Sequence, residues 1–125
     1  MIKITDYMTR PVITTKANDT IRVAVTKMDR YNIGSLVVMN GKKVVGIVTE
    51  RDILRKAVAR KIDIETTLVN RIMTSTVQTI SATGSLIEVA SIMKSHSMRR
   101  IVVIGKNGKP AGVVTSKDLI DILCT

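Results

Sequence analysis

The 125-residue chain contains no phenylalanine and no tryptophan, and Tyr7 and Tyr31 are its only tyrosines. It also has a single cysteine, Cys124, and a single histidine, His96. One thiol excludes an internal disulfide, and one cysteine with one histidine is too few for a structural zinc site. No apolar run approaches the roughly 18 residues of a membrane-spanning helix, and the first residues lack the pattern of a signal peptide. We therefore expect a cytoplasmic protein without a metal site and without membrane association.

An apolar fraction of 45% and a formal net charge of +10 are the features that the chain does have. That apolar fraction is too high for a disordered chain, so we expect a globular core built from Ile, Val, Leu, Met and Ala. The positive charge indicates an anionic partner such as a nucleotide, a nucleic acid or a membrane surface, and does not choose among them. No five like charges follow one another, which argues against a basic arm that binds nucleic acid.

An internal repeat organises the sequence. A shift of 65 residues places Met8-Thr9 on Met73-Thr74, and after one inserted residue Gly46–Asp52 falls on Gly112–Asp118. The matches keep their order along nearly the whole chain, so we interpret the protein as a tandem duplication. The expected repeats cover residues 1–63 and 64–125.

Each repeat is predicted to contain a strand, a helix, two strands and a second helix. Apolar residues at i, i+3, i+4 and i+7 indicate the first helix of each repeat. These stripes are Ile21, Ala24, Val25 and Met28, and Leu86, Val89, Ala90 and Met93. Asn18 or Asp19 is the expected N-cap of the first, and Ser85 with Glu88 forms a capping box on the second.

The later elements of each repeat follow from strand and turn signals. We expect strands at 35–39 and 44–49 and at 100–104 and 111–115, second helices from 50 to about 60 and from 116 to about 123, and a connection at 61–67. The almost wholly apolar strands suggest sheets covered on both faces. The predicted fold is therefore α+β, with two β-α-β-β-α repeats related by a pseudo-twofold axis, their sheets packed together and their helices outside.

The repeated order of Met-Thr, helix, apolar strand and Gly-h-h-Thr-x-x-Asp, where h is apolar, resembles the cystathionine β-synthase (CBS) domain. The tandem arrangement is similar to a CBS pair, or Bateman module, over residues 4–123. This resemblance implies a non-enzymatic regulatory module that requires no cofactor. It would bind an adenosine-containing ligand (AMP, ADP, ATP or an S-adenosylmethionine-like molecule) in clefts between the repeats and pass the signal to an effector protein. It also implies a homodimer.

The two Thr-x-x-Asp motifs have two compatible interpretations. At a strand-to-helix junction they form a variant of the capping box. A carboxylate in the first helical turn can also accept hydrogen bonds from both hydroxyls of a ribose, while the helix N-terminus and Arg51 or Lys117 favour a phosphate. Family members that bind adenosine nucleotides use this aspartate for the ribose, which implies the same role for Asp52 and Asp118.

The resemblance assigns the ligand-contacting residues to two clefts. One would combine Ile47, Thr49, Arg51 and Asp52 with Thr74, Gln78 and Met98, and the other Val113, Thr115, Lys117 and Asp118 with Thr9, Ile13, Ile33 and Gly34. The small Gly34 leaves space for a base, so Asp118 is expected to contribute more than Asp52. Arg99 and Arg100 either contact phosphate, as basic residues do there in nucleotide-binding relatives, or belong to an exposed, solvated strand edge.

Two other functions compete with this interpretation. A nucleic-acid-binding protein would explain the charge, but stacking aromatics are missing and the basic residues are dispersed, so only weak association is expected. A structural dimerisation module with empty pockets would explain the fold. His96 lacks a nucleophile elbow, so we expect no catalysis. The methionines at 8, 28, 73 and 93 occupy matching repeat positions, which favours core packing.

Overall fold

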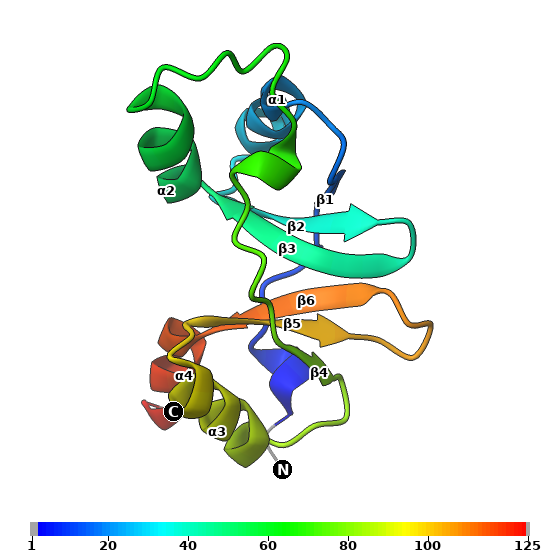
Figure 1. Cartoon of the computed structure of the whole chain (residues 1–125). Helices are drawn as coiled ribbons and strands as arrows, with labels where there is room; N and C mark the ends of the chain where they lie inside the picture. Colours follow the sequence, from blue (N-terminus) through cyan, green and yellow to red (C-terminus); the bar gives the residue numbers. More distant parts are fainter. Residues whose placement is uncertain (1–2, 125) are drawn as a thin grey trace. The chain divides into compact units, whose positions relative to one another are not determined.

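The computed structural model describes residues 3–124, which divide into two compact units. One unit spans Ile13–Val77, and the other joins the chain up to Val12 to the chain from Gln78 onward. Each unit contains a strand, a helix, two strands and a second helix (Figure 1), which confirms the predicted α+β repeat. The expected repeat boundary at residue 63 concerns the duplication and stays a prediction. The compact units instead follow the contacts.

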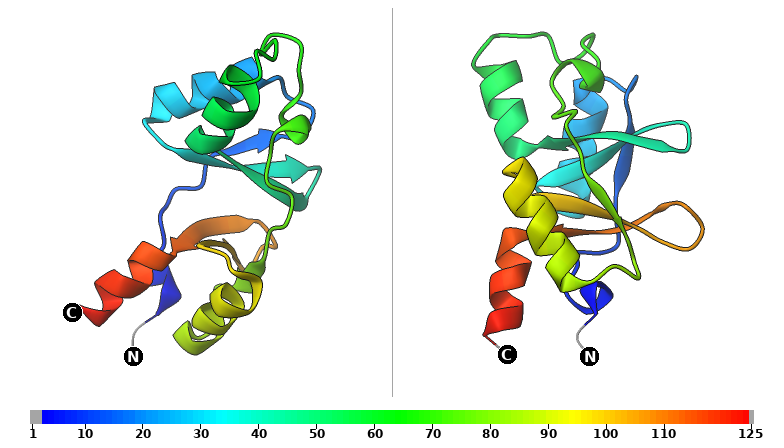
Figure 2. Two further views of the ribbon diagram at one scale, coloured as in Figure 1. Left: turned by 60° about the vertical axis from the view of Figure 1, so that its left-hand side comes forward. Right: turned by 60° about the horizontal axis from the view of Figure 1, so that its bottom comes forward.

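The unit Ile13–Val77 contains one sheet in the order β1-β2-β3, in which β1 is parallel and β3 antiparallel to the central strand β2. Its strands are β1 (Thr14–Lys16), β2 (Ser35–Asn40) and β3 (Lys43–Thr49). Its helices are α1 (Ile21–Tyr31), α2 (Glu50–Asp52) with its direct π-helical continuation Ile53–Val58, and the short 3-10 helix Val69–Arg71. Both α1 and α2 lie on one face of this sheet (Figure 1, Figure 2).

The second unit repeats this topology with the sheet order β4-β5-β6, again with one parallel and one antiparallel pair. Its strands are β4 (Thr79–Ser81), β5 (Arg100–Ile104) and β6 (Pro110–Thr115). Its helices are α3 (Leu86–His96), α4 (Ser116–Leu123) and the 3-10 helix Ile4–Asp6. Figure 2 shows α3 and α4 on the same face of the sheet.

Each unit has its own apolar core between the sheet and the helices. Ile21, Ala24 and Met28 of α1 are buried, as the helical stripe predicts. In α3 the stripe is only partly right, because Ala90 is exposed and Ile92 packs against the core. The Ser85–Glu88 capping box is confirmed. No helix in residues 3–124 is long and apolar enough to cross a membrane.

The segment preceding each repeat's first strand packs on the other repeat's last strand. Met73 lies against Gly46 of β3, where a Cβ would come within 2.6 Å of the methionine sulfur. Met8 lies against Gly112 of β6 in the same way. Glycine is required at both strand positions because the methionine occupies the space of a side chain. Met28 and Met93 are buried as well, so all four matched methionines pack in the cores.

The connection expected at 61–67 is longer in the structure and forms part of the first unit. Ile62 and Ile64 pack against its core, and Leu68 forms an isolated β-bridge with Thr20. The short 3-10 helix that follows contributes the buried Val69. The chain from 61 to 77 is therefore structural rather than a free linker.

The expected N-cap of α1 was wrong. Thr20, not Asn18 or Asp19, accepts the hydrogen bond from the Val23 N–H, at 3.3 Å. The Asp19 carboxylate instead accepts bonds from the Lys16 N–H and the Thr15 hydroxyl, both at 2.8 Å. Asp19 is engaged in the preceding turn, so the extended residue after it caps the helix.

This turn makes stability depend on pH. Burial by itself raises the pKa of Asp19, but its hydrogen bonds and the Lys27 ammonium outweigh burial and lower the pKa below the ordinary 3.8. A lowered folded-state pKa means that the stabilisation is present at neutral pH and is lost as pH falls through that pKa. We expect Asp19→Asn to lower the free energy of unfolding by about 1 kcal/mol at pH 7. In urea titrations the difference from wild type should shrink below about pH 4.

The control is Asp29→Asn on α1, because no other side chain among residues 3–124 bonds to the Asp29 carboxylate. It should leave stability nearly unchanged. Equal effects of the two substitutions at every pH would contradict the role of Asp19.

Candidate functional site

Thr49 and Asp52 form a complete capping box where β3 meets α2. The Thr49 hydroxyl accepts the Asp52 N–H at 3.2 Å. Asp52 Oδ2 accepts the Thr49 N–H at 3.0 Å and the Thr49 hydroxyl at 3.1 Å. The helix begins here because these bonds satisfy backbone donors that a first turn otherwise leaves unpaired. The local interpretation of this motif as a cap is therefore confirmed.

The second motif repeats this geometry between β6 and α4. Asp118 Oδ2 accepts the Thr115 N–H at 2.8 Å, and the Thr115 hydroxyl accepts the Asp118 N–H at 3.2 Å. Within residues 3–124 no hydrogen bond or ion pair engages the other carboxylate oxygen, Oδ1. The two turns therefore share a fold but differ in the freedom of their carboxylates.

Lys56 accounts for this difference. Its Nζ lies 3.0 Å from Asp52 Oδ1, and it also donates a hydrogen bond of 3.1 Å to the Ile72 carbonyl. Asp52 is buried, with 7% of its surface exposed. The corresponding position four residues after Asp118 holds Ile122, whose apolar side chain is buried.

Backbone pairing holds a threonine segment beside each turn. Ile47 and Thr74 exchange two hydrogen bonds, of 3.0 and 2.8 Å, in the first unit. Thr9 and Val113 exchange the corresponding bonds, of 2.8 and 3.2 Å, in the second. The structure thus brings each predicted Thr next to the strand that leads into its Thr-x-x-Asp turn.

A second backbone contact fixes the start of each helix. The Glu50 N–H donates to the Gly34 carbonyl at 3.0 Å, and the Ser116 N–H donates to the Arg99 carbonyl at 2.9 Å. The sites expected from the sequence therefore divide between the units. Around the Asp52 turn the first unit gathers Ile47, Thr49, Arg51, Asp52, Thr74 and Gly34, and around the Asp118 turn the second gathers Val113, Thr115, Lys117, Asp118, Thr9 and Arg99.

The remaining predicted residues belong to each turn's opposite unit or lie on neighbouring strands. Gln78, Met98 and Arg100 belong to the unit of the Asp118 turn, and Ile13 and Ile33 to the unit of the Asp52 turn. The Ile13 carbonyl accepts the Val37 N–H, and the Gln78 carbonyl accepts the Val102 N–H. Their contact with a ligand stays a prediction.

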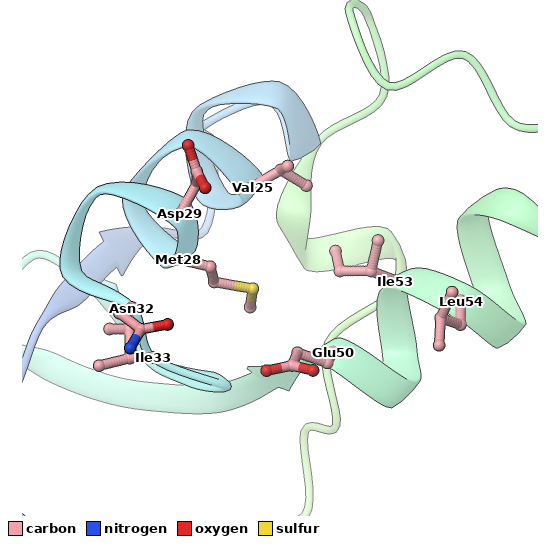
Figure 3. Close-up of a pocket in the computed structure, with 8 residues that line it drawn as sticks. All are labelled: Val25, Met28, Asp29, Asn32, Ile33, Glu50, Ile53 and Leu54. Atoms are coloured by element: carbon pink, nitrogen blue, oxygen red, sulfur yellow. The ribbon is translucent and has the colours of Figure 1, made fainter.

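The expectation of free space beside Gly34 is not met within its own unit. A Cβ at Gly34 would lie 2.7 Å from Glu50 Oε1, so this side chain takes up the room that the glycine leaves. Glu50 and Ile33 instead line a groove of about 340 Å³ between α1 and the helix after β3 (Figure 3). Met28, Ile53 and Leu54 provide much of its apolar wall, and Asp29 and Asn32 its polar rim.

The basic residues of the predicted site are exposed. Arg51, Arg99 and Arg100 form no ion pair within the described residues, so their charges are available to an anion. Lys117 lies 3.5 Å from Asp121, but its side chain is 84% exposed, and such surface pairs contribute little. Among residues 3–124 no group of three His, Cys, Asp or Glu side chains could hold a metal ion.

The family model for the CBS domain matches twice, at residues 4–59 and 69–124. The chain belongs to the CBS domain family. It is 36% identical to an uncharacterised 17.7 kDa protein of Acidianus ambivalens over 94% of this chain and 70% of that protein. CBS-domain pairs are generally regulatory rather than catalytic.

Two solved CBS structures are similar to this chain and contain adenosine compounds. The Pyrobaculum aerophilum CBS domain protein PAE2072, complexed with AMP, is 29% identical, with a TM-score of 0.78 over 99% of this chain and 100% of that one. The CBS domain pair of protein MJ0100, complexed with 5′-methylthioadenosine and S-adenosyl-L-methionine, is 27% identical. Its TM-score is 0.77, over 98% of this chain and 96% of that one.

Sequence reasoning missed two side chains of this CBS pair. Lys56 follows Asp52 by four residues, a spacing at which opposite charges meet on a helix, so the sequence did contain a signal. The position of Glu50 over Gly34 had no such signal, because it depends on how the chain before β2 approaches the start of α2.

The ion pair predicts unequal structural roles for the two aspartates. Asp52→Asn removes the partner of a half-buried lysine, and we expect the free energy of unfolding to fall by about 2 kcal/mol. Asp118→Asn removes only a carboxylate near a helix start, with an expected loss of about 0.3–1 kcal/mol. Urea unfolding of both variants, without ligand, measures the difference. A larger loss for Asp118→Asn would contradict this assignment.

Proposed function

We propose that the protein is a non-enzymatic regulatory module that binds an adenosine-containing ligand at a Thr-x-x-Asp turn and passes the signal to a partner protein. The candidate ligands are AMP, ADP, ATP and S-adenosylmethionine-like molecules. The AMP, methylthioadenosine and S-adenosylmethionine complexes of the similar CBS proteins support this ligand class.

One observation supports the proposal most strongly: Asp118 uses Oδ2 to cap α4 and keeps Oδ1 free of partners within the described chain. Capping and ligand binding are therefore compatible in one side chain. The free oxygen can accept charge-assisted hydrogen bonds from ribose hydroxyls. The N-terminus of α4 and the exposed Lys117 favour a phosphate or carboxylate of the same ligand.

Regulation follows if the ligand binds one conformation of the module better than another. The ligand shifts the population by no more than its difference in affinity for the two conformations. An effector protein that contacts the favoured conformation then responds to ligand concentration. No chemical step on the ligand is needed.

We expect Asp118→Asn to weaken ligand binding by about 1.5–3 kcal/mol, the range for hydrogen bonds to charged groups. The reason is that asparagine keeps a capping oxygen but loses the charged acceptor. Isothermal titration calorimetry with AMP, ADP, ATP and S-adenosylmethionine measures the effect. The matched control is Asp121→Asn, which removes an exposed carboxylate from the same helix and should leave affinity unchanged. Unchanged affinity in Asp118→Asn, with a lowered melting temperature, would mean that Asp118 is a cap alone.

We also propose that the protein forms a homodimer through its second helices. Leu54 and Ile120 occupy matching positions in the two repeats, and they are 62% and 58% exposed. Val58 and Leu123 extend the exposed apolar surface on the same helices. A large apolar side chain kept exposed in both copies favours a protein interface, and a second copy of the chain presents the same surfaces.

The double variant Leu54→Glu, Ile120→Glu should be monomeric at micromolar concentrations at which the wild type is a dimer, because buried charge opposes association. Light scattering coupled to size exclusion measures the mass. Ile87→Arg is the control, since Ile87 is 80% exposed and the first repeat has Arg22 at that position. A monomeric wild type, or dissociation by the control alone, would contradict the proposed interface.

A further inference from the structure

The two turns differ in how many acceptor positions their carboxylates keep for a ligand. Asp52 Oδ2 accepts two hydrogen bonds from Thr49, and Oδ1 accepts the Lys56 ammonium at 3.0 Å. Asp118 engages only Oδ2, with a single bond from Thr115. Both aspartates have the same backbone setting, so the difference comes from side chains alone.

Lys56 is held in place by more than its charge. It bonds both Asp52 and the Ile72 carbonyl, and its side chain is only 35% exposed. A ribose hydroxyl that bound Asp52 would have to displace the ammonium or approach a residue that exposes 7% of its surface. Removing one partner of a desolvated ion pair leaves the other charge uncompensated, which is costly.

The second repeat has no corresponding cation. Ile122 occupies the position that matches Lys56, and an alkyl side chain cannot compete for a carboxylate. Asp118 is also only half-buried, so its free oxygen is accessible to a ligand. The duplication thus contains one occupied and one available copy of the same turn.

We propose that Lys56 blocks the Asp52 turn, so that the chain binds one adenosine-type ligand, at the Asp118 turn. This inference rests on the proposed function and specifies it further. Lys56 is then the residue that sets the number of ligands per chain, and Asp52 has a structural role.

Calorimetric titration with AMP and with S-adenosylmethionine tests the inference on the full chain. Wild type should bind one ligand per chain, and Lys56→Met should bind two. The matched control is Arg55→Met, which removes an exposed neighbouring cation that forms no ion pair among residues 3–124, and it should keep one. Asp118→Asn should lose at least ten times more affinity than Asp52→Asn. If Lys56→Met fails to fold, this last comparison alone decides between the turns.

A ligand-free measurement separates the two levels of the proposal. In a double-variant cycle, the unfolding midpoint of Asp52→Asn, Lys56→Met should fall by less than the sum of the single shifts, since either change breaks the same pair. Additive shifts, or two ligands bound by wild type, would overturn the blocking role and leave the proposed function standing. Coupled shifts with no binding of any adenosine compound to any variant would overturn the proposed function and confine Lys56 to a structural ion pair.

Discussion

The close contact between a methionine and a glycine of the last strand is the constraint on which each unit depends. Met73 fills the space beside Gly46, and Met8 fills the space beside Gly112. The adjacent threonine in each case exchanges two backbone hydrogen bonds with the strand. Any side chain at these glycines would collide with the methionine, so the contact exists only because the strand lacks a Cβ there. Each repeat is thereby completed by a segment from before the other repeat's first strand.

This contact also positions the candidate site. The strand that receives the methionine leads directly into the Thr-x-x-Asp turn, and the threonine segment is fixed beside it. A carbonyl from the loop before the central strand binds the first N–H of the following helix, at Gly34 in one unit and Arg99 in the other. The aspartate is therefore oriented by its cap and by the backbone on both sides. A ligand would meet a preorganised carboxylate, which lowers the entropic cost of binding.

Duplication preserved this backbone and changed the side chains around it. Lys56 faces one aspartate where Ile122 stands near the other, and Glu50 covers Gly34 where the second repeat has Ser116 and Arg99. The backbone of the turn depends on local hydrogen bonds that both repeats share, so these positions could diverge without loss of fold. A symmetric scaffold with unequal sites is the result, and its basic groups Arg51, Arg99 and Lys117 remain exposed in both units.

The sequence alone determined the repeat, the order of elements and both Thr-x-x-Asp caps, because hydrophobic periodicity, hairpin turns and capping boxes are local patterns. It did not determine the cap of α1, where Asp19 bonds backward to Thr15 and leaves Thr20 as the N-cap. Nor did it show that the chain before each repeat completes the other unit, or that Glu50 covers Gly34. Only the tertiary structure decided these features, because each depends on contacts between residues distant in sequence or on competition between neighbouring polar groups for one donor. The state of the two carboxylates lies between these cases: the Asp52–Lys56 spacing is visible in the sequence, but the burial that gives the ion pair its weight arises only in the fold.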